Sequence, residues 1–297
     1  MKQIIKPVLR YYGSKHKSFN QIAPFIPKHQ VYVEPFGGSA SVLLNKHPSR
    51  LEVYNDLDID LYRLFRVLGA HPLSYRLQQE VKATDWNKKN WEQAFDESSD
   101  LLTSSLNTLI RSWMSFSPMG TTYGRTGYRT GLYVASNQSS HSSSQTNHTT
   151  GHPAIWEKLP ERIALVTKRL NQTPAPIVAL NSDGLSVLDE YDDPNTLFYI
   201  DPPYVHSTRG SESGYRHEME LEQHAELLDR LSSVKGAVML SGYPSALYKL
   251  LLKDWTVHEF SACASGRAGG MLRTECLWLN QRCLQLQAQT SLFALPG

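Results

Sequence analysis

The strongest constraint on the fold of this 297-residue chain is an alternation of strand and helix patterns in two separate blocks. In the first block, strand patterns at residues 31–33 and 51–54 are each followed by a helix pattern. The second block has strand patterns at residues 177–180, 196–200, 237–240, 256–260 and 274–280. Helices are expected at residues 40–46, 59–68, 221–234 and 245–252. This alternation predicts an α/β fold with a doubly wound, mainly parallel sheet.

The region between the two blocks, residues 70–176, has a different pattern. Helix patterns at residues 72–81, 91–113 and 154–170 enclose loops that are rich in glycine and serine. We interpret this region as a mostly helical insertion. The α/β domain is then made of residues 1–69 and 177–297.

Two segments lack the pattern of a regular element. Residues 136–152 contain no apolar side chain, which predicts a mobile loop. This loop holds His141, His148 and His152, but no carboxylates or cysteines are spaced with them as zinc ligands would be. Residues 281–297 show no clear pattern, and we expect a loose tail there.

The composition suits a soluble globular protein, with 20% charged and 40% hydrophobic residues. No apolar run has the length of a membrane span, and the polar start of the chain is unlike a signal peptide. We therefore expect a cytoplasmic protein without a membrane partner. Cys263, Cys276 and Cys283 lack a C-x-x-C spacing, so neither a disulfide framework nor a zinc site is predicted.

Basic residues gather in the middle of the chain, although the net charge is only +2. Residues 101–175 contain two acidic residues, Glu157 and Glu161, against seven basic ones. The basic residues are Arg111, Arg125, Arg129, Lys158, Arg162, Lys168 and Arg169. This excess indicates a modest phosphate-facing surface.

The tetrapeptide Asp201-Pro202-Pro203-Tyr204 follows the strand pattern at residues 196–200. Open α/β sheets bind ligands at the carboxyl ends of their strands, which is where this tetrapeptide lies. Asp201 offers an acceptor for an amino group, and the two prolines stiffen the turn and leave carbonyl oxygens free to accept. Tyr204 offers a flat face for a planar base. The alternative is a proline-rich turn with Tyr204 packed in the core.

A second motif, residues 34–40, follows the first strand and opens a helix. Its sequence is Glu34-Pro35-Phe36-Gly37-Gly38-Ser39-Ala40, and the small residues allow a ligand to approach the backbone at a helix N-terminus. Asp56 lies 18 residues beyond Gly38 (56 − 38), at the end of the next strand, where a carboxylate suits the hydroxyls of a ribose. Both NAD and S-adenosylmethionine fit this pairing. The full G-x-G-x-x-G of a dinucleotide fold is missing, which favours a ligand without a pyrophosphate.

Two shorter segments complete the set. Arg10-Tyr11-Tyr12-Gly13-Ser14-Lys15 places aromatic rings and a cation before the first strand, and Asn181-Ser182-Asp183-Gly184 follows another strand. Asp183 is able to accept from an adenine amino group. The alternatives are surface aromatics with a solvated lysine, and an aspartate that only caps a helix.

In this order, the four motifs resemble the Dam-like, alpha-group family of DNA N6-adenine methyltransferases. The resemblance covers residues 10 to 280 approximately, because residues 239–243 and 274–278 also look like late segments of the family. Two positions depart from the family pattern: Ala40 replaces the last glycine of the second motif, and Ser14 replaces a common glycine. Neither departure removes a reactive group.

The resemblance implies a Rossmann-like class I methyltransferase that uses S-adenosylmethionine, forms S-adenosylhomocysteine and needs no metal. Asp201 and the Pro202 carbonyl would hold the two hydrogens of the adenine amino group, and Tyr204 would stack on the flipped-out base. The cofactor residues would be Tyr11, Tyr12, Lys15, Glu34, Pro35, Phe36, Gly38, Ala40, Ser41, Asp56, Leu57, Asp183, Gly184 and Asp201. Pro203 completes the catalytic tetrapeptide.

The resemblance also makes the insertion the region that reads the DNA sequence. Residues 124–131 combine arginines, hydroxyls and an aromatic on flexible backbone, although a solvated loop is the alternative. The expected DNA contacts are Arg111, Arg125, Tyr128, Arg129, His206, Ser207 and Arg209. We expect double-stranded DNA as the partner, with a cognate restriction nuclease as a further one. A bacterial or phage protein that is a monomer or weak dimer is expected.

Three other functions share some of these features. Related amino-methyltransferases act on cytosine N4, on RNA adenine or on a protein glutamine amide. A nicotinamide-dependent oxidoreductase would need the missing pyrophosphate loop. A DNA-binding relative that has lost its activity is the third. Four intact residues argue against it: Lys15, Asp56, Asp201 and Tyr204.

Overall fold

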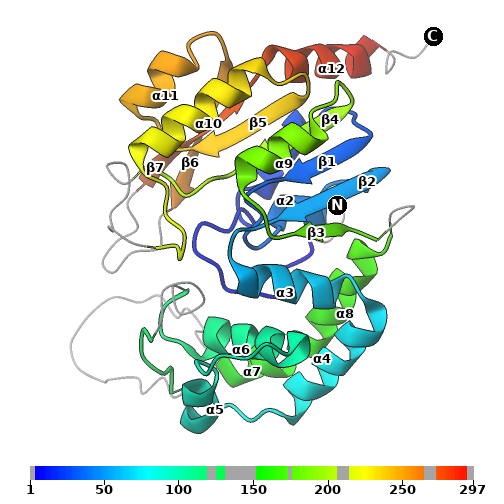
Figure 1. Cartoon of the computed structure of the whole chain (residues 1–297), viewed down its shortest axis with the longest axis vertical. Helices are drawn as coiled ribbons and strands as arrows, with labels where there is room; N and C mark the ends of the chain where they lie inside the picture. Colours follow the sequence, from blue (N-terminus) through cyan, green and yellow to red (C-terminus); the bar gives the residue numbers. More distant parts are fainter. Residues whose placement is uncertain are drawn as a thin grey trace, which may run out of the picture.

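The computed structural model describes residues 4–118, 125–130, 152–172, 176–205, 214–263 and 272–292. Its centre is a seven-stranded sheet with the strand order β3-β2-β1-β4-β5-β7-β6 (Figure 1). β7 is antiparallel to both β5 and β6, and the other neighbouring strands are parallel. The strands are β1 (Val31–Glu34), β2 (Leu51–Asn55), β3 (Val178–Leu180), β4 (Thr196–Ile200), β5 (Ala237–Gly242), β6 (Thr256–Cys263) and β7 (Leu272–Leu279).

Strand order reverses between β1 and β4, and this reversal places the site. From β1 the chain adds β2 and β3 on one side, whereas β4 and β5 extend the sheet on the other. β1 and β4 are parallel neighbours, with Val33 opposite Phe198, so their carboxyl ends lie at the same edge. A ligand crevice is expected where a doubly wound sheet reverses in this way. The predicted Rossmann-like α/β fold is confirmed.

Helices cover both faces of the sheet, because alternate strand residues point to opposite sides. Phe198 and Ile200 of β4 pack against α9, α10 and α11 on one face. Leu197 and Tyr199 belong to the larger core on the other face, which includes residues of α1 to α4, α6, α8 and α12. These helices are α1 (Phe19–Ile22), α2 (Ser41–Asn45), α3 (Ile59–Leu68), α4 (His71–Ala83), α6 (Leu101–Met114), α8 (Leu159–Leu170), α9 (Gly184–Tyr191), α10 (Leu221–Ser233), α11 (Ala246–Leu251) and α12 (Gln281–Leu292). No described helix is both long and apolar enough to cross a membrane.

The region between α3 and β3 is helical in its described part, as the sequence predicts, and it lies below the sheet in Figure 1. Two of the expected helices are divided. The pattern at residues 91–113 becomes α5 (Lys88–Gln93) and α6, because the Asp100 carboxylate caps α6 by accepting from the Thr103 amide at 2.7 Å. The pattern at residues 154–170 becomes α7 (His152–Glu157) and α8. The division into a catalytic domain and an insertion stays a prediction.

The expected loose tail is wrong for residues 281–292, which form α12. The Asn280 side chain caps this helix, since its Oδ1 accepts from the Cys283 amide at 2.9 Å. The same oxygen accepts from the Val238 amide on β5 at 3.0 Å, and Cys283 is fully buried. α12 is therefore fixed to the sheet. The expected mobile loop, residues 136–152, lies outside the described residues except for His152, the first residue of α7.

A buried charge cluster joins α8 to the α/β core. Glu52 on β2 is 1% exposed and pairs with both Lys46 and Arg169. The Arg169 guanidinium donates to both Glu52 oxygens, at 2.8 and 3.0 Å, and to the Leu43 carbonyl at 2.6 Å. Burial lowers the pKa of Lys46 to about 8, even though Glu52 opposes that shift. One carboxylate therefore holds two buried cations in place.

Replacing Glu52 with glutamine is expected to lower the free energy of unfolding by about 3–5 kcal/mol, because buried cations lose their partner. Urea denaturation measures this loss. The matched control is Glu92→Gln on α5, whose 3.5 Å pair with Lys88 is exposed. Its effect should stay within about 0.5 kcal/mol. Equal stability of the two variants would contradict the prediction.

Candidate active site

The carboxyl ends of β1, β2, β3 and β4 surround a cavity of about 1200 Å³, its open mouth included. The N-terminal segment around residues 11–15 and a segment at 215–219 close its sides. Among the predicted cofactor residues, all except Ala40 line this cavity. The topology of the sheet therefore brings four motifs together that lie far apart in the sequence.

Ala40 is buried behind the cavity, at the start of α2. Its φ is 52°, in the left-handed region that glycine adopts freely and that costs other residues about 1–2 kcal/mol. The family pattern has glycine at this position, so the departure noted in the sequence coincides with backbone strain. The other departure, Ser14, joins a hydroxyl cluster: its Oγ lies 2.9 Å from the hydroxyls of Ser39 and Ser41.

Asp56 links the second motif to the loop after β2, as the 18-residue spacing suggests. One carboxylate oxygen accepts from the Gly38 amide at 2.8 Å, and the other accepts from the Asp58 amide at 2.8 Å. Gly38 has φ +48°, and a Cβ there would lie 2.8 Å from the Tyr11 ring, so the turn requires glycine. Burial raises the pKa of Asp56 to about 7.

Asp183 both caps a helix and lines the cavity. One of its carboxylate oxygens accepts from the amides of Leu185 and Ser186, at 3.0 and 3.1 Å, at the start of α9. The capping alternative is therefore confirmed. Asp183 is also exposed and contributes to the cavity wall, so an additional contact to a ligand is compatible with this geometry.

Glu34 is a second buried carboxylate at the cavity. A single Glu34 oxygen accepts from the Tyr32 hydroxyl and from the Leu43 amide, both at 2.7 Å. Burial raises the pKa of Glu34 to about 8, although these two hydrogen bonds oppose the shift. The carboxyl group therefore fixes the start of α2 against β1.

Lys15 is not the solvated surface lysine of the alternative interpretation, since it is only 5% exposed. Its ammonium donates to both carboxylate oxygens of Asp201, at 2.7 and 2.8 Å, and to the Gly13 carbonyl at 3.0 Å. Burial raises the pKa of Asp201, and the charge of Lys15 opposes this shift. Although burial disfavours the charged lysine, Asp201 raises the pKa of Lys15 overall.

Tyr204 is packed in the protein interior, as the second interpretation of the tetrapeptide expects. It is 9% exposed, and its hydroxyl donates to Glu275 at 2.6 Å. Its ring contacts Tyr243 edge-on, with 4.6 Å between the centroids, and the Lys15 ammonium lies 4.9 Å from the Tyr204 ring. Of the tetrapeptide, Asp201 and Pro203 line the cavity, whereas Pro202 and Tyr204 are not among its lining residues.

The sequence analysis missed Glu275 as a residue of this site. Glu275 lies on β7, is 7% exposed and is 3.3 Å from the Lys15 ammonium. The charge of Lys15 and the Tyr204 hydroxyl hold its pKa below the usual value, although burial alone would raise it. An acidic residue at the start of the buried run 275–280 was the available signal, because such a residue is rarely buried without a partner.

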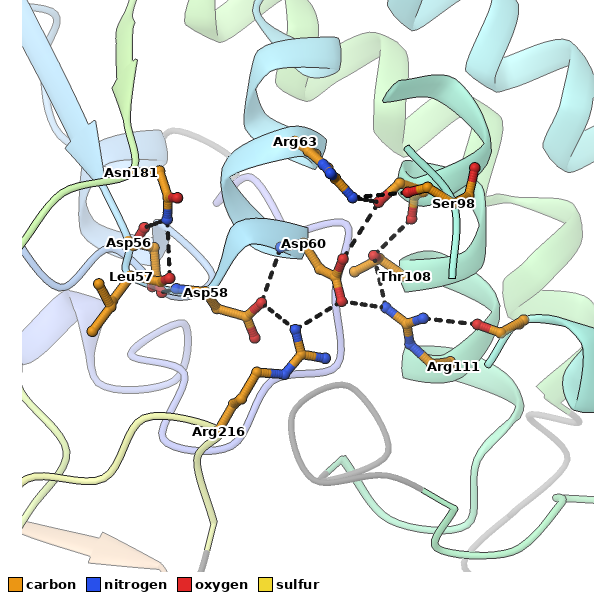
Figure 2. A network of polar contacts seen from close by, with 12 residues as sticks. Asp56, Leu57, Asp58, Asp60, Arg63, Ser98, Thr108, Arg111, Asn181 and Arg216 are labelled. Atoms are coloured by element: carbon orange, nitrogen blue, oxygen red, sulfur yellow. Dashed lines mark hydrogen bonds and ion pairs between the residues drawn. The ribbon is translucent and has the colours of Figure 1, made fainter. Parts of the chain in front are cut away.

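The structure argues against Arg111 as a DNA contact. Arg111 is 9% exposed, and its guanidinium donates to Asp60 at 2.8 Å and to the Ala94 carbonyl at 2.7 Å. Arg216 reaches the same Asp60 from the other side, at 2.9 Å, and also binds Asp58 at 2.8 Å (Figure 2). Arg111 therefore joins α6 to α3 and offers little surface to a phosphate.

The other predicted DNA contacts fall into two groups. Arg125 is exposed, with its guanidinium 5.2 Å from the Phe95 ring, and Tyr128 is half-buried against Trp91. The Arg129 Nη1 atom is buried and has no hydrogen-bond partner in the described part of the chain. Burial and the charge of Arg10 lower the pKa of Arg129 to about 10. His206, Ser207 and Arg209 lie outside the described residues.

Acidic side chains dominate the described wall of the cavity. Its two strong cations, Lys15 and Arg216, are both paired with carboxylates. One oxygen of Asp58 is buried and has no hydrogen-bond partner within the described ranges. The described residues contain no cluster of three or more potential metal ligands. The acidic wall residues are Glu34, Asp56, Asp58, Asp183, Asp201, Glu218 and Glu226.

The Rossmann-like sheet, with its cavity at the reversal point, defines the class of doubly wound α/β proteins, which bind their ligands in this place. Within this class, residues 11–264 match the family of D12 class N6 adenine-specific DNA methyltransferases. The match covers most of the chain, so the chain belongs to this family. The resemblance seen in the four motifs is confirmed.

Two curated relatives support this membership. The modification methylase LlaI of Lactococcus lactis subsp. lactis is 27% identical over 277 residues, which is 89% of this chain and 41% of that protein. The modification methylase StsI of Streptococcus sanguinis is 35% identical over 97 residues, covering 32% of this chain and 15% of that protein. The chain thus spans less than half the length of either relative.

Among solved structures, the rRNA methyltransferase aviRa from Streptomyces viridochromogenes covers 93% of this chain, and the match spans 88% of that protein. The sequence identity is 11% and the TM-score is 0.37, which is too distant a likeness to inform the site.

Asp60 lies at the centre of the charge network in Figure 2, because it accepts from both Arg111 and Arg216. We expect Asp60→Asn to lower the free energy of unfolding by about 3 kcal/mol, since it leaves Arg111 buried without an anionic partner. Thermal or urea denaturation measures the loss. The control is Asp189→Asn, because Asp189 is 61% exposed in its pair with Arg230. That change should cost at most about 1 kcal/mol. An Asp60→Asn variant as stable as the wild type would show that the network in Figure 2 contributes little to stability.

Proposed function

We propose that this chain is an S-adenosylmethionine-dependent methyltransferase that methylates N6 of adenine at a specific site in DNA. The observation that carries the proposal is the Asp201 carboxylate, which lies at the cavity wall after β4 and is held by the buried Lys15. A carboxylate in this place is suited to accept hydrogen bonds from an amino group. Family membership supplies the substrate class.

The chemistry of the cavity fits S-adenosylmethionine better than a dinucleotide. A sulfonium cation is favoured among carboxylates, whereas a pyrophosphate would need cations that are free to bind it. Lys15 and Arg216 are already paired. The acceptor oxygen of Asp58 without a partner also suits a donor on the ligand.

The four motifs would divide the cofactor between them. Asp56 would accept from the ribose hydroxyls, while Phe36 and Asp183 would bind the adenine ring and its amino group. The methionine part of the cofactor would lie against the turn at Gly38 and the N-terminal segment. When bound, S-adenosylmethionine supplies a methyl group that is already activated by the sulfonium.

The residues of this chain would position the amino nitrogen and stabilise its developing charge. The Asp201 carboxylate and the Pro202 carbonyl would accept the two hydrogens of the adenine amino group. Negative charge held at Asp201 stabilises the positive charge that grows on the nitrogen during transfer. Asp201 need not be a strong base, because the methylated ammonium is acidic and loses its proton readily. Correct positioning supplies much of the remaining rate enhancement.

Methylation of double-stranded DNA would require the target adenine to leave the helix. Stacking of the base on Tyr204 would need a change at the Tyr243 contact, because the Tyr204 ring is packed in this structure. Arg125 and Arg129 would contact phosphates, and Arg111 is left out of the proposed interface. A cognate nuclease, a cytoplasmic location and a monomeric or weakly dimeric state are part of the same proposal.

The first test incubates the protein with labelled S-adenosylmethionine and duplex DNA of mixed sequence, and quantifies N6-methyladenine by mass spectrometry. The wild type should form it, and Asp201→Ala should lower the rate at least about 100-fold, because it removes a preorganised acceptor. The melting temperature of the variant should fall, because Lys15 loses a buried partner. A cooperative thermal transition together with retained cofactor binding would show that the variant is folded.

The same assay decides between the substrates. Methyladenine in RNA but not in DNA would replace the proposed substrate with RNA. Cofactor binding without methylation of DNA or RNA would turn the search to cytosine or protein amides. An Asp201→Ala variant as active as the wild type would remove Asp201 from the mechanism.

The pKa of Asp56 predicts how cofactor affinity depends on pH. This carboxyl group has a pKa of about 7, so it is mostly ionised at pH 8 and mostly protonated at pH 6. If the ionised form binds the ribose, the dissociation constant for S-adenosylmethionine should rise roughly tenfold from pH 8 to pH 6. Isothermal titration calorimetry at the two pH values measures this change.

Asp56→Asn is the control for this dependence, because it keeps every other titrating group of the protein and the ligand. The affinity of this variant for S-adenosylmethionine should be weaker at both pH values. Its change between the two pH values should lack the contribution from the titration of Asp56. Glu34→Gln tests the other carboxyl group with a raised pKa, which is about 8 for Glu34. A dependence that persists in Asp56→Asn and disappears in Glu34→Gln would assign the titration to Glu34.

A further inference from the structure

The Lys15 ammonium contacts two carboxylates, of which only Asp201 belongs to one of the four motifs. The second is Glu275 on β7, at 3.3 Å from Lys15 Nζ. The Glu275 oxygen that faces Lys15 also accepts from the Tyr204 hydroxyl at 2.6 Å. The other Glu275 oxygen accepts from the Ser18 hydroxyl at 3.3 Å. Glu275 therefore touches both the lysine and the tyrosine of the site.

The charge of this cluster depends on Glu275. One ammonium and two carboxylates leave a net charge of −1, whereas Lys15 and Asp201 alone would form a neutral pair. All three side chains are at most 18% exposed, so water screens the cluster weakly. A neutral pair would offer little stabilisation to a positive charge that develops beside it.

The hydrogen bonds of Lys15 lead to the same conclusion. Lys15 donates to both oxygens of Asp201, which weakens that carboxylate as an acceptor for a substrate amino group. Glu275, the second carboxylate near the ammonium, shares the electrostatic attraction of Lys15. Lys15 therefore neutralises less of the negative charge on Asp201. Tyr204, with its hydroxyl bound to Glu275, is kept next to Pro203 at the cavity wall.

We propose that Glu275 is a positioning residue for methyl transfer: it holds Lys15 and Tyr204 in place and leaves the buried cluster negatively charged. This charge stabilises the amino nitrogen through Asp201 as the nitrogen becomes positive. The inference rests on the proposed function and adds a residue outside the four motifs.

Glu275→Gln separates this role from a merely structural one. Glutamine has nearly the same shape, and its carbonyl oxygen still accepts from the Tyr204 hydroxyl, so the packing is kept while the charge is lost. We expect the single-turnover rate constant for methyl transfer to fall on the order of 10- to 100-fold. The dissociation constant for S-adenosylmethionine should change less than about threefold, since Glu275 does not line the cavity.

A second readout does not need activity. The negative charge of Glu275 raises the pKa of Asp201, so Glu275→Gln should lower it. The pH dependence of the carboxyl ¹³C signal of Asp201, assigned with Asp201→Asn, measures this pKa in the free protein. In the assay, the acid limb of the rate profile should move to lower pH by the same amount. The other groups that face Asp201 are Lys15, Tyr199, Tyr204, Glu34, Tyr11 and Tyr248, and the variant retains all of these side chains.

Two further variants serve as controls. Glu259→Gln removes an exposed carboxylate from β6, opposite Cys276 in the same hairpin, and should leave rate and titration unchanged. Glu275→Asp restores the charge on a shorter side chain and should recover part of the rate. Recovery by aspartate but not by glutamine identifies the charge as the requirement.

Two outcomes would overturn the proposal. One is an unchanged pKa of Asp201 in Glu275→Gln, because the carboxylates would then not be coupled. The other is an active wild type with a Glu275→Gln variant that transfers methyl equally fast. A wild type that methylates neither DNA nor RNA overturns the proposed function instead, and the ¹³C titration still decides whether Glu275 sets the charge of the cluster.

Discussion

The buried ammonium of Lys15 is the contact on which the candidate site depends. It bonds to Asp201 after β4 and to Glu275 on β7, and it brings the N-terminal segment against the sheet. An unpaired lysine at this depth would lose its charge or be excluded from the core. The two carboxylates therefore fix the N-terminal wall of the cavity, and Lys15 in turn keeps both acids inside the protein.

A second group of charges connects the cavity to the helical region. Asp58 and Asp60 lie just after Asp56, and they bind Arg216 beside the cavity and Arg111 on α6. Through these pairs the loop after β2, the segment at 214–219 and α6 share one polar network (Figure 2). A substitution in one of these elements should therefore alter the hydrogen bonds and ion pairs of the others.

Much of the fold was predictable because apolar periodicity reports burial directly. The seven expected strands are all present, and Gly38 and Asp56 meet as their spacing suggests. Sequence patterns said less about residues whose partners lie far away along the chain. Arg111 is buried and paired with Asp60, so its expected DNA contact stays a prediction. The expected loose tail forms α12 up to residue 292.

The sequence by itself determined which segments form strands and helices, the four motifs and the family. All of these depend on residue types and on their spacings along the chain. Only the tertiary structure decided which charges are buried together. Lys15, Asp201 and Glu275 are separated by 186 and 74 positions (201 − 15 and 275 − 201), and no local pattern relates them. Their contact follows from the strand order β4-β5-β7, which brings the residue after β4 close to Glu275 on β7. The three charges then share one low-dielectric space, in which each one needs the others as partners.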